Sequence, residues 1–200
     1  MPLAFSEFTE PEAAALMMIP IDRLNAATRE EAIDLMEPLV ERSRWVVEET
    51  VALRPFADRD ALASALDQTI RAAGPEAQVA LFNNHPELAG REAEENTMTP
   101  ASTDEQARLG LLRLSSADAQ RLRELNAAYR ERFGFPFIIA LHRVPDLGSL
   151  FATFERRLAA PPAVEHEATL AEIASVIRSR TVRLFAPSSI NTAETPGVMS

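Results

Sequence analysis

The stretch TLAEIASVIRSRTVRLF, residues 169–185, decides the fold class. Its apolar residues recur at steps of three and four, which is the spacing of one face of an α-helix. That face carries Leu170, Ile173, Ile177, Arg180 and Leu184. A buried guanidinium is costly unless an anion and hydrogen bonds meet it. Two interpretations of Arg180 therefore stay open: an internal salt bridge or a side chain that leaves the helix end for solvent, or an anion site at the floor of a pocket.

Helical signals recur on the N-terminal side of this stretch. Thr28 and Glu31 form a capping-box pattern before an apolar run, and Pro38 predicts a kink or a restart within it. Further helices are expected, each with a capping residue or a stop signal, at residues 58–75, 115–134 and 146–162. Only residues 135–141, FPFIIAL, favour a short extended or buried connection.

These patterns predict an all-α, single compact multi-helix domain over residues 16–185. We expect a loose N-terminal tail at residues 1–15 and a flexible C-terminal tail at residues 186–200. No apolar run reaches membrane-spanning length, and the N-terminus carries acids where a signal peptide needs basic residues. A cytoplasmic location is the default expectation.

The composition excludes several kinds of chemistry. The chain has no cysteine, so disulfides, thiolate nucleophiles and Cys-rich zinc sites are excluded. All 20 basic residues are arginine, which excludes Schiff-base lysines and a phosphate-loop lysine. A net charge of −10 argues against a nucleic-acid partner, because phosphate binding needs a basic face.

His85 is one of three histidines and lies in FNNHPELAG, residues 82–90. Pro86 suits the first turn of a helix, which predicts His85 at a helix entrance, as a cap or as a reactive group. Neither His142 nor His166 has such a setting, and both look like surface or edge positions. With no clustered acids near three histidines, we expect no metal site.

The stretch ASTDEQARLGLLRL, residues 101–114, gives Ser102 and Glu105 the spacing of a capping box. That pattern is common and has a purely structural interpretation. Gln106 follows directly and places an amide beside the carboxylate, and a helix N-terminus also attracts anions. Both interpretations stay open on the residues alone.

Taken together, these segments resemble the 2-oxo-4-hydroxy-4-carboxy-5-ureidoimidazoline (OHCU) decarboxylases. The similarity spans roughly residues 20–184 and rests on these stretches in order: RSRWVVEETVALRPF, HPELAG, ASTDEQARLGL, LNAAYRERFGFPFIIAL, FERRL and ATLAEIASVIRSR. The resemblance implies an all-helical, cofactor-free homodimer that converts OHCU to (S)-allantoin and carbon dioxide in urate breakdown.

The resemblance also implies a set of site residues. The catalytic groups would be His85, Glu105 and Arg180. Substrate binding would fall to Pro86, Ser102, Gln106, Phe137, Ile138, Ile139, Ala140 and Leu141. Arg178 and Arg183 lie close to Arg180, so which arginine faces the pocket stays open. The alternatives are a helical binding or regulatory module of the same fold, and a decarboxylase of a related ureido or imidazoline carboxylate.

Overall fold

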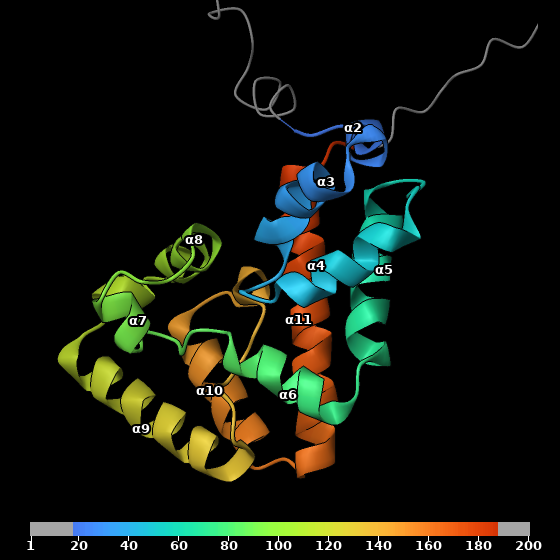
Figure 1. Ribbon diagram of the computed structural model, residues 1–200. Coiled ribbons are helices and arrows are strands. Elements are labelled where there is room, and N and C mark those ends of the chain that lie inside the picture. Colours follow the sequence, from blue (N-terminus) through green and yellow to red (C-terminus); the bar gives the residue numbers. More distant parts are fainter. Residues whose placement is uncertain (1–17, 188–200) are drawn as a thin grey trace, which may run out of the picture.

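The computed structural model describes residues 18–187 and shows an all-α domain (Figure 1). The expectation for the two tails lies almost entirely outside these residues. The elements run in the order α2 (Ile21–Ala26), α3 (Arg29–Met36), η2 (Glu37–Leu39), α4 (Arg44–Thr50), η3 (Val51–Leu53), α5 (Arg59–Ala72), α6 (Pro75–Asn83), α7 (Arg91–Glu94), α8 (Pro100–Arg108), η4 (Leu111–Arg113), α9 (Ser116–Phe133), η5 (Leu141–Arg143), α10 (Leu147–Leu158) and α11 (Pro162–Leu184). The all-α prediction is confirmed.

The capping signals in the sequence mark real helix starts. Asp58, Ser115 and Asp146 each accept a hydrogen bond from a backbone N–H of the first turn, at 2.7, 3.1 and 2.7 Å. Thr28 and Glu31 form the expected capping box at the start of α3. Such bonds satisfy N–H groups that the helix itself leaves free. At the other end, Gly134 closes α9 with a left-handed φ of 80°.

The helix predicted from residues 169–185 is longer than that stretch. α11 begins at Pro162, where a proline is tolerated because the first helical N–H has no partner. It runs through the middle of the molecule, with α5 beside it (Figure 1). Its buried face packs into the main core with Leu170, Ile173 and Ile177. Arg180 lies near the C-terminal end of this central helix, so the segments that pack against this end lie close to its guanidinium.

Pro38 produces a restart rather than a kink. α3 gives way to the short η2, the chain turns through Arg42 at φ 42°, and α4 begins at Arg44. The missing proline N–H and the ring clash explain why one helix does not continue here. The turn brings Glu41 to the interior, where it is 1% exposed.

The capping-box prediction at Ser102 is wrong. α8 begins at Pro100, and its N-cap is Thr99, whose hydroxyl accepts a bond from the Ser102 N–H at 3.3 Å. Pro100 occupies the first helical position, which moves the start of the helix ahead of Ser102. Ser102 and Glu105 therefore lie within the helix, three residues apart and on neighbouring positions of one face.

Residues 135–141 form the buried connection that the sequence predicts. Every residue in the segment is buried, and Leu141 starts the short η5. Within residues 18–187 the sole β pairing is an isolated bridge between Ile19 and Phe185, which joins the two ends of the described chain. No helix among these residues is both long enough and apolar enough to cross a membrane.

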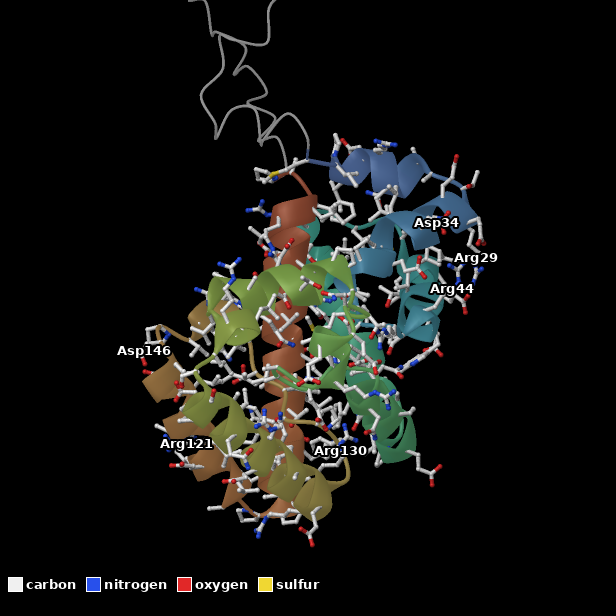
Figure 2. The ribbon with its side chains drawn as sticks, turned by 90° about the vertical axis from the view of Figure 1, so that its left-hand side faces the viewer. Arg29, Asp34, Arg44, Arg121, Arg130 and Asp146 are labelled. Atoms are coloured by element: carbon white, nitrogen blue, oxygen red, sulfur yellow. The ribbon has the colours of Figure 1, made fainter. Side chains whose placement is uncertain are left out.

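Arginine–carboxylate pairs connect helices at the surface, and Figure 2 labels two of these arginines, Arg44 and Arg121. Arg44 on α4 lies among four acidic side chains, the nearest being Glu30 at 2.6 Å. Arg121 joins α9 to α10 by its pair with Glu155 at 2.5 Å. Exposed pairs of this kind contribute at most about 1 kcal/mol each to the stability of the fold, so the buried groups contribute more.

Candidate active site

One cavity gathers side chains from four separate parts of the chain. The cavity is small: the volume open to the centre of a water-sized sphere is about 40 Å³. Its wall comprises the loop after α6, α8, the 135–141 segment and α11: His85, Pro86, Leu88, Ser102, Glu105, Gln106, Phe137, Ile138, Ile139, Leu141, Val176 and Arg180.

Most of the expected site residues therefore lie together. Among the eleven named from the sequence, ten are in this wall. The exception is Ala140, which is fully buried but is not part of the wall. Arg178 points elsewhere and lies 3.7 Å from Asp60 on α5, with 60% of its side chain exposed. Arg183 is also half exposed. Arg180 is thus the arginine that faces the cavity.

His85 lies at a helix exit, which corrects the expected helix entrance. α6 ends at Asn83, the His85 backbone N–H bonds back to the Phe82 carbonyl at 3.1 Å, and α7 begins only at Arg91. Pro86 starts no helix. The carbonyls at the end of α6 explain the position: the Leu81 carbonyl, which accepts from the Asn84 N–H at 3.1 Å, also lies 3.1 Å from the imidazole Nδ1.

This contact fixes the tautomer of His85. A carbonyl oxygen can only accept a hydrogen bond, so Nδ1 carries a proton and Nε2 is the nitrogen left for chemistry. Burial lowers the pKa of His85 below the ordinary 6.5, against the opposing influence of Glu41 and the Leu81 carbonyl. His85 is therefore a neutral imidazole with a basic Nε2 at neutral pH.

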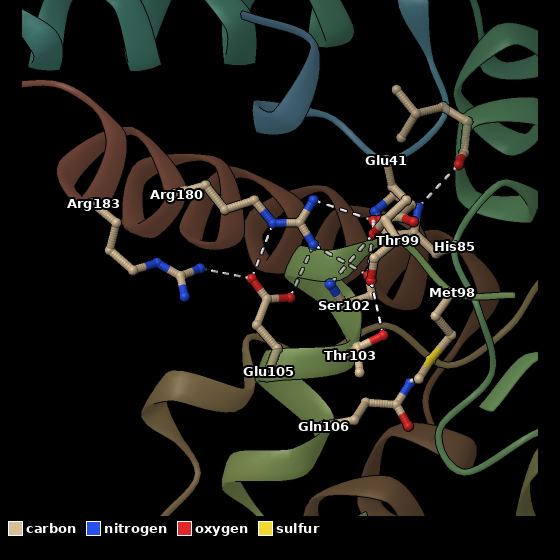
Figure 3. A network of polar contacts seen from close by, with 11 residues as sticks. Glu41, His85, Met98, Thr99, Ser102, Thr103, Glu105, Gln106, Arg180 and Arg183 are labelled. Carbon is tan, nitrogen blue, oxygen red and sulfur yellow. Dashed lines mark hydrogen bonds and ion pairs between the residues drawn. The ribbon is translucent and has the colours of Figure 1, made fainter. Parts of the chain in front are cut away.

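Arg180 is buried and makes an internal salt bridge, so the salt-bridge interpretation is confirmed and the solvent-exposed alternative is wrong. Its guanidinium is 6% exposed. Nε and Nη2 donate to the two oxygens of Glu105, both at 2.9 Å, and Nη1 donates to Glu41 at 3.2 Å (Figure 3). A further bond reaches the Ser102 hydroxyl at 3.3 Å. The guanidinium lines the cavity while its charge is shared by two carboxylates.

Glu105 is held as a carboxylate. Burial alone would raise the pKa of Glu105, but hydrogen bonds and charge from Arg180 and Arg183 outweigh it and lower that pKa below its usual value. The Arg183 contact, at 2.9 Å, approaches from the solvent side (Figure 3). Glu105 can accept hydrogen bonds, but it is a poor proton donor near neutrality.

Glu41 belongs to this cluster and was missed by the sequence analysis. Its Oε2 accepts bonds from Thr99 at 3.0 Å, Ser102 at 2.8 Å and Arg180 at 3.2 Å. Its Oε1 is buried and has no hydrogen-bond partner among the described residues. Only its position after the apolar Leu39 and Val40, where the helix pattern breaks, could have drawn attention to it.

Gln106 holds the histidine loop in place. Its Oε1 accepts from the Ala89 N–H at 2.8 Å, and its Nε2 donates to the Glu87 carbonyl at 3.3 Å. Ala89 adopts a left-handed φ of 46°, a conformation that costs a non-glycine residue roughly 1 kcal/mol or more. The hydrogen bonds of the Gln106 side-chain amide help to maintain this turn beside His85.

The apolar wall is fixed through its backbone. Arg157 on α10 donates to the Ile138 carbonyl at 2.7 Å, and Glu172 on α11 accepts from the Ala140 N–H at 2.8 Å. Arg108 on α8 donates to the Leu141 carbonyl. Three helices thus hold a segment that has no regular structure of its own, which keeps Phe137, Ile138, Ile139 and Leu141 against the cavity.

The other two histidines lie outside this wall. Of the two positions expected for His166, surface or edge, the half-buried site on α11 fits the edge: its Nε2 lies 2.7 Å from the Gln78 Oε1, and its ring contacts Phe82. His142 is exposed, and its Nε2 lies 3.3 Å from the Ser175 hydroxyl. Among residues 18–187 no group of three or more histidine and acidic side chains could hold a metal ion.

A family model and individual related proteins point to the same family. A family model described as OHCU decarboxylase matches residues 25–182. The OHCU decarboxylase of Halalkalicoccus jeotgali is 32% identical over 84% of this chain and 93% of its own length. The mouse enzyme of the same name is 32% identical over 82% of this chain and 91% of its own.

Solved structures agree on the fold. A crystal structure of OHCU decarboxylase in the presence of (S)-allantoin superposes with a TM-score of 0.61 at 21% identity, covering 80% of this chain and 99% of that one. A crystal structure of (S)-allantoin synthase gives 0.64 at 21% identity and covers 84% of this chain and 54% of that one. On its sequence and its helical architecture, this chain belongs to the OHCU decarboxylase family.

Proposed function

We propose that this protein is a carboxy-lyase that decarboxylates OHCU to (S)-allantoin without a cofactor. One observation supports this more than any other. In a member of the OHCU decarboxylase family, an imidazole, a carboxylate and a guanidinium from three distant parts of the chain line one small cavity.

The substrate supplies its own electron sink. Its carboxylate is bonded to a ring carbon that neighbours an imine carbon. When the carbon–carboxylate bond breaks, its electron pair forms a double bond between the two ring carbons, and the imine nitrogen takes the charge and then a proton from solvent. Carbon dioxide leaves. The protein has to hold the ring, remove the hydroxyl proton and add a proton to one face of the neighbouring carbon, which are tasks of positioning and electrostatics.

His85 is the proton carrier in this proposal. Its neutral Nε2 takes the proton of the ring hydroxyl, which becomes a carbonyl, and the resulting imidazolium returns the proton to the neighbouring carbon. The Nδ1 contact with Leu81 supports this assignment because it holds the ring with Nε2 unprotonated. Glu105 is the weaker candidate for this step, since its ion pairs keep it ionised.

Arg180 and Glu105 bind the substrate as a pair. The Nε and Nη2 donors of Arg180 already meet Glu105, so a bidentate contact with the substrate would displace that carboxylate. We therefore assign to Arg180 a single charge-assisted bond from Nη1 to an anionic or carbonyl oxygen. Glu105 accepts hydrogen bonds from the ureido N–H groups.

The remaining wall orients the ring. Phe137, Ile138, Ile139 and Leu141 supply apolar contact, and free backbone groups in residues 137–141 read the amide edges of the ring. Pro86 and Ser102 close the polar side of the cavity. Gln106 acts on the substrate mainly through the histidine loop that it holds, and Ala140 acts through the backbone of its segment.

The test is a stereochemical one. OHCU is generated in situ from urate by its upstream enzymes, this protein is added, and the circular dichroism of allantoin is followed. A fast increase in one enantiomer supports the proposal, because uncatalysed decay gives a racemic product. No acceleration would favour a binding or regulatory module of the same fold. Slow turnover would point to a related ureido or imidazoline carboxylate as the true substrate.

Two further proposals concern assembly and location. The protein forms a homodimer, a proposal that rests on the resemblance alone; light scattering on a gel-filtration column would test it by giving twice the monomer mass of 22.0 kDa. It works in the cytoplasm, the default expectation from the sequence, which fractionation of the producing cells would test.

A further inference from the structure

We propose that Glu41 is a positioning residue of this site: its buried carboxylate stabilises the imidazolium that His85 forms after taking the hydroxyl proton of the substrate. The inference deepens the proposed function and rests on it for the identity of the reaction. The electrostatic part, a dependence of His85 on Glu41, can be tested without any substrate.

The first argument is the burial of an incompletely paired carboxylate. Glu41 is 1% exposed, and three donors converge on Oε2 while Oε1 has no hydrogen-bond partner within residues 18–187. Burying a charged oxygen without a partner is expensive, and a carboxylate that served only to fix Arg180 would be more stable with both oxygens bonded. The unpaired oxygen is available to a second positive charge.

The second argument is that the Glu41 segment is fastened to the histidine loop. Asn84, the residue before His85, donates through Nδ2 to the Arg42 carbonyl and to the Ser43 hydroxyl, both at 3.0 Å. These two acceptors directly follow Glu41. Figure 3 shows Glu41 and His85 on the same side of the Arg180 guanidinium. The carboxylate and the imidazole are therefore held on adjoining, hydrogen-bonded segments.

The third argument is the balance of charge around the imidazole. The charged groups that face His85 are Glu41 from the turn before α4, Glu105 from α8 and Arg180 from α11. Two carboxylates share one buried guanidinium, and the second arginine on Glu105, Arg183, is half exposed. With Arg183 counted the charges cancel, but Arg183 reaches Glu105 and not Glu41, so the one cation that Glu41 contacts among the described residues is Arg180, which Glu105 shares. Protonation of His85 would give Glu41 a second positive neighbour.

The electrostatics agree with this arrangement. Burial is the largest influence on the pKa of His85 and lowers it, and the charge of Glu41 is the largest influence that opposes burial. A purely structural role for Glu41, as a clamp between α8 and α11, predicts no such effect on the imidazole. The titration of His85 distinguishes the two roles.

The experiment measures the pKa of His85 by NMR of the ring carbons in the full-length protein and in the Glu41→Gln and Glu41→Asp variants. Three histidines make the assignment simple. In Glu41→Gln the pKa of His85 falls by about 1 unit, and in Glu41→Asp, which keeps the charge, most of the shift is recovered. Glu48→Gln is the matched control: it also neutralises a glutamate paired with an arginine, but on the surface, and it leaves His85 unchanged.

Turnover of OHCU gives a second readout. A shift of 1 unit corresponds to a factor of about ten, so kcat of Glu41→Gln falls by up to about tenfold while KM changes less. A higher KM together with an unchanged pKa of His85 would overturn the inference and leave Glu41 as a structural clamp.

Should Glu41→Gln fail to fold, the wild-type protein still decides the matter. The carboxyl carbon of Glu41 must then report the titration of His85 at the same pH, and the carboxyl carbon of Glu48 must not. Absence of that response would also overturn the inference. If the NMR results hold but wild-type protein does not act on OHCU, the reaction assignment fails and the coupling between Glu41 and His85 stands.

Discussion

Two buried arginines lie near opposite ends of the central helix: Arg157 contacts it from α10, and Arg180 is part of it. They are used in opposite ways. Arg157 of α10 is paired one-to-one with Glu165 near the start of α11, and both side chains are buried. Its Nε donates to the Glu165 oxygens at 2.9 and 3.2 Å, and its other donors reach the Ile138 carbonyl and the Thr169 hydroxyl. Tyr129 also donates to Glu165. Every charge in this cluster has its counterpart.

Arg180, at the other end of the same helix, has two carboxylate partners and lines a cavity. One oxygen of Glu41 has no hydrogen-bond partner in the described part of the chain, and a histidine lies beside the cluster. The difference shows what separates a structural ion pair from a reactive site in this fold. The Arg157 cluster is balanced and closed, whereas the Arg180 cluster opens onto a cavity and leaves one carboxylate oxygen unpaired among residues 18–187.

The largest effect on activity is expected for His85→Asn. Removal of the proton carrier lowers kcat by about 100- to 10,000-fold, the usual contribution of general acid–base catalysis. The fold should persist, with an unfolding free energy within about 1 kcal/mol of wild type. Stopped-flow assays of OHCU decay and urea denaturation measure the two quantities. The control is His142→Asn on the surface, for which we expect a kcat close to wild type. An equal loss of kcat in this variant would mean that the effect is not specific to His85.

The balanced cluster should respond in stability instead. Arg157→Leu leaves Glu165 buried without its cation and lowers the unfolding free energy by about 3–5 kcal/mol. The double variant Arg157→Met with Glu165→Gln recovers part of that loss, because no unpaired charge is left. Urea denaturation checks both. If Arg157→Leu were as stable as wild type, the Arg157 cluster would not be structural.

Glu105→Gln converts the Arg180 cluster into a one-to-one pair with Glu41, similar to the Arg157 cluster. We expect kcat/KM to fall by about 10- to 100-fold, the equivalent of one charged hydrogen bond. The unfolding free energy should fall by about 1–3 kcal/mol, less than in the Arg157 cluster, since Arg180 keeps its bond to Glu41. Steady-state kinetics with denaturation curves test this. A large loss of stability with little loss of activity would reverse the roles of the two clusters.

The smallest effect is a pH dependence. Burial lowers the pKa of His85 below 6.5, and the neutral form is the active base. Lowering the pH protonates Nε2, so kcat/KM must decline on the acidic side with an apparent pKa below 6.5 and stay level just above it. A pH profile of kcat/KM measures this. An acidic limb centred above pH 6.5 would contradict a neutral, buried imidazole.

Much of the fold could be predicted from local patterns. Caps such as Asp58, Ser115 and Asp146 act within a few residues, so the sequence around them contains the whole cause. The start of α8 was misplaced because Thr99 and Ser102 both fit a capping position, and Pro100 decides between them. His85 was misplaced for a similar reason: the competition between a following proline and a preceding helix end cannot be weighed locally.

The site was harder to predict because its contacts are long-range. Arg180 stood out as a charge in an apolar stripe, but its partner Glu41 is 139 residues away in sequence. The local sequence around Glu41 does not show that this side chain is buried, since its burial depends on the packing of α8 and α11 against it. Similarly, the role of Gln106 depends on a turn at Ala89 that only the folded loop reveals.

A crystal structure of this protein soaked with (S)-allantoin tests the central claim most directly. The account predicts that allantoin occupies the cavity between His85 and the 137–141 segment, with a hydrogen bond from Arg180 and the His85 Nε2 facing the ring. Allantoin bound in another part of the molecule, with this cavity still lined by the same unliganded side chains, would contradict it.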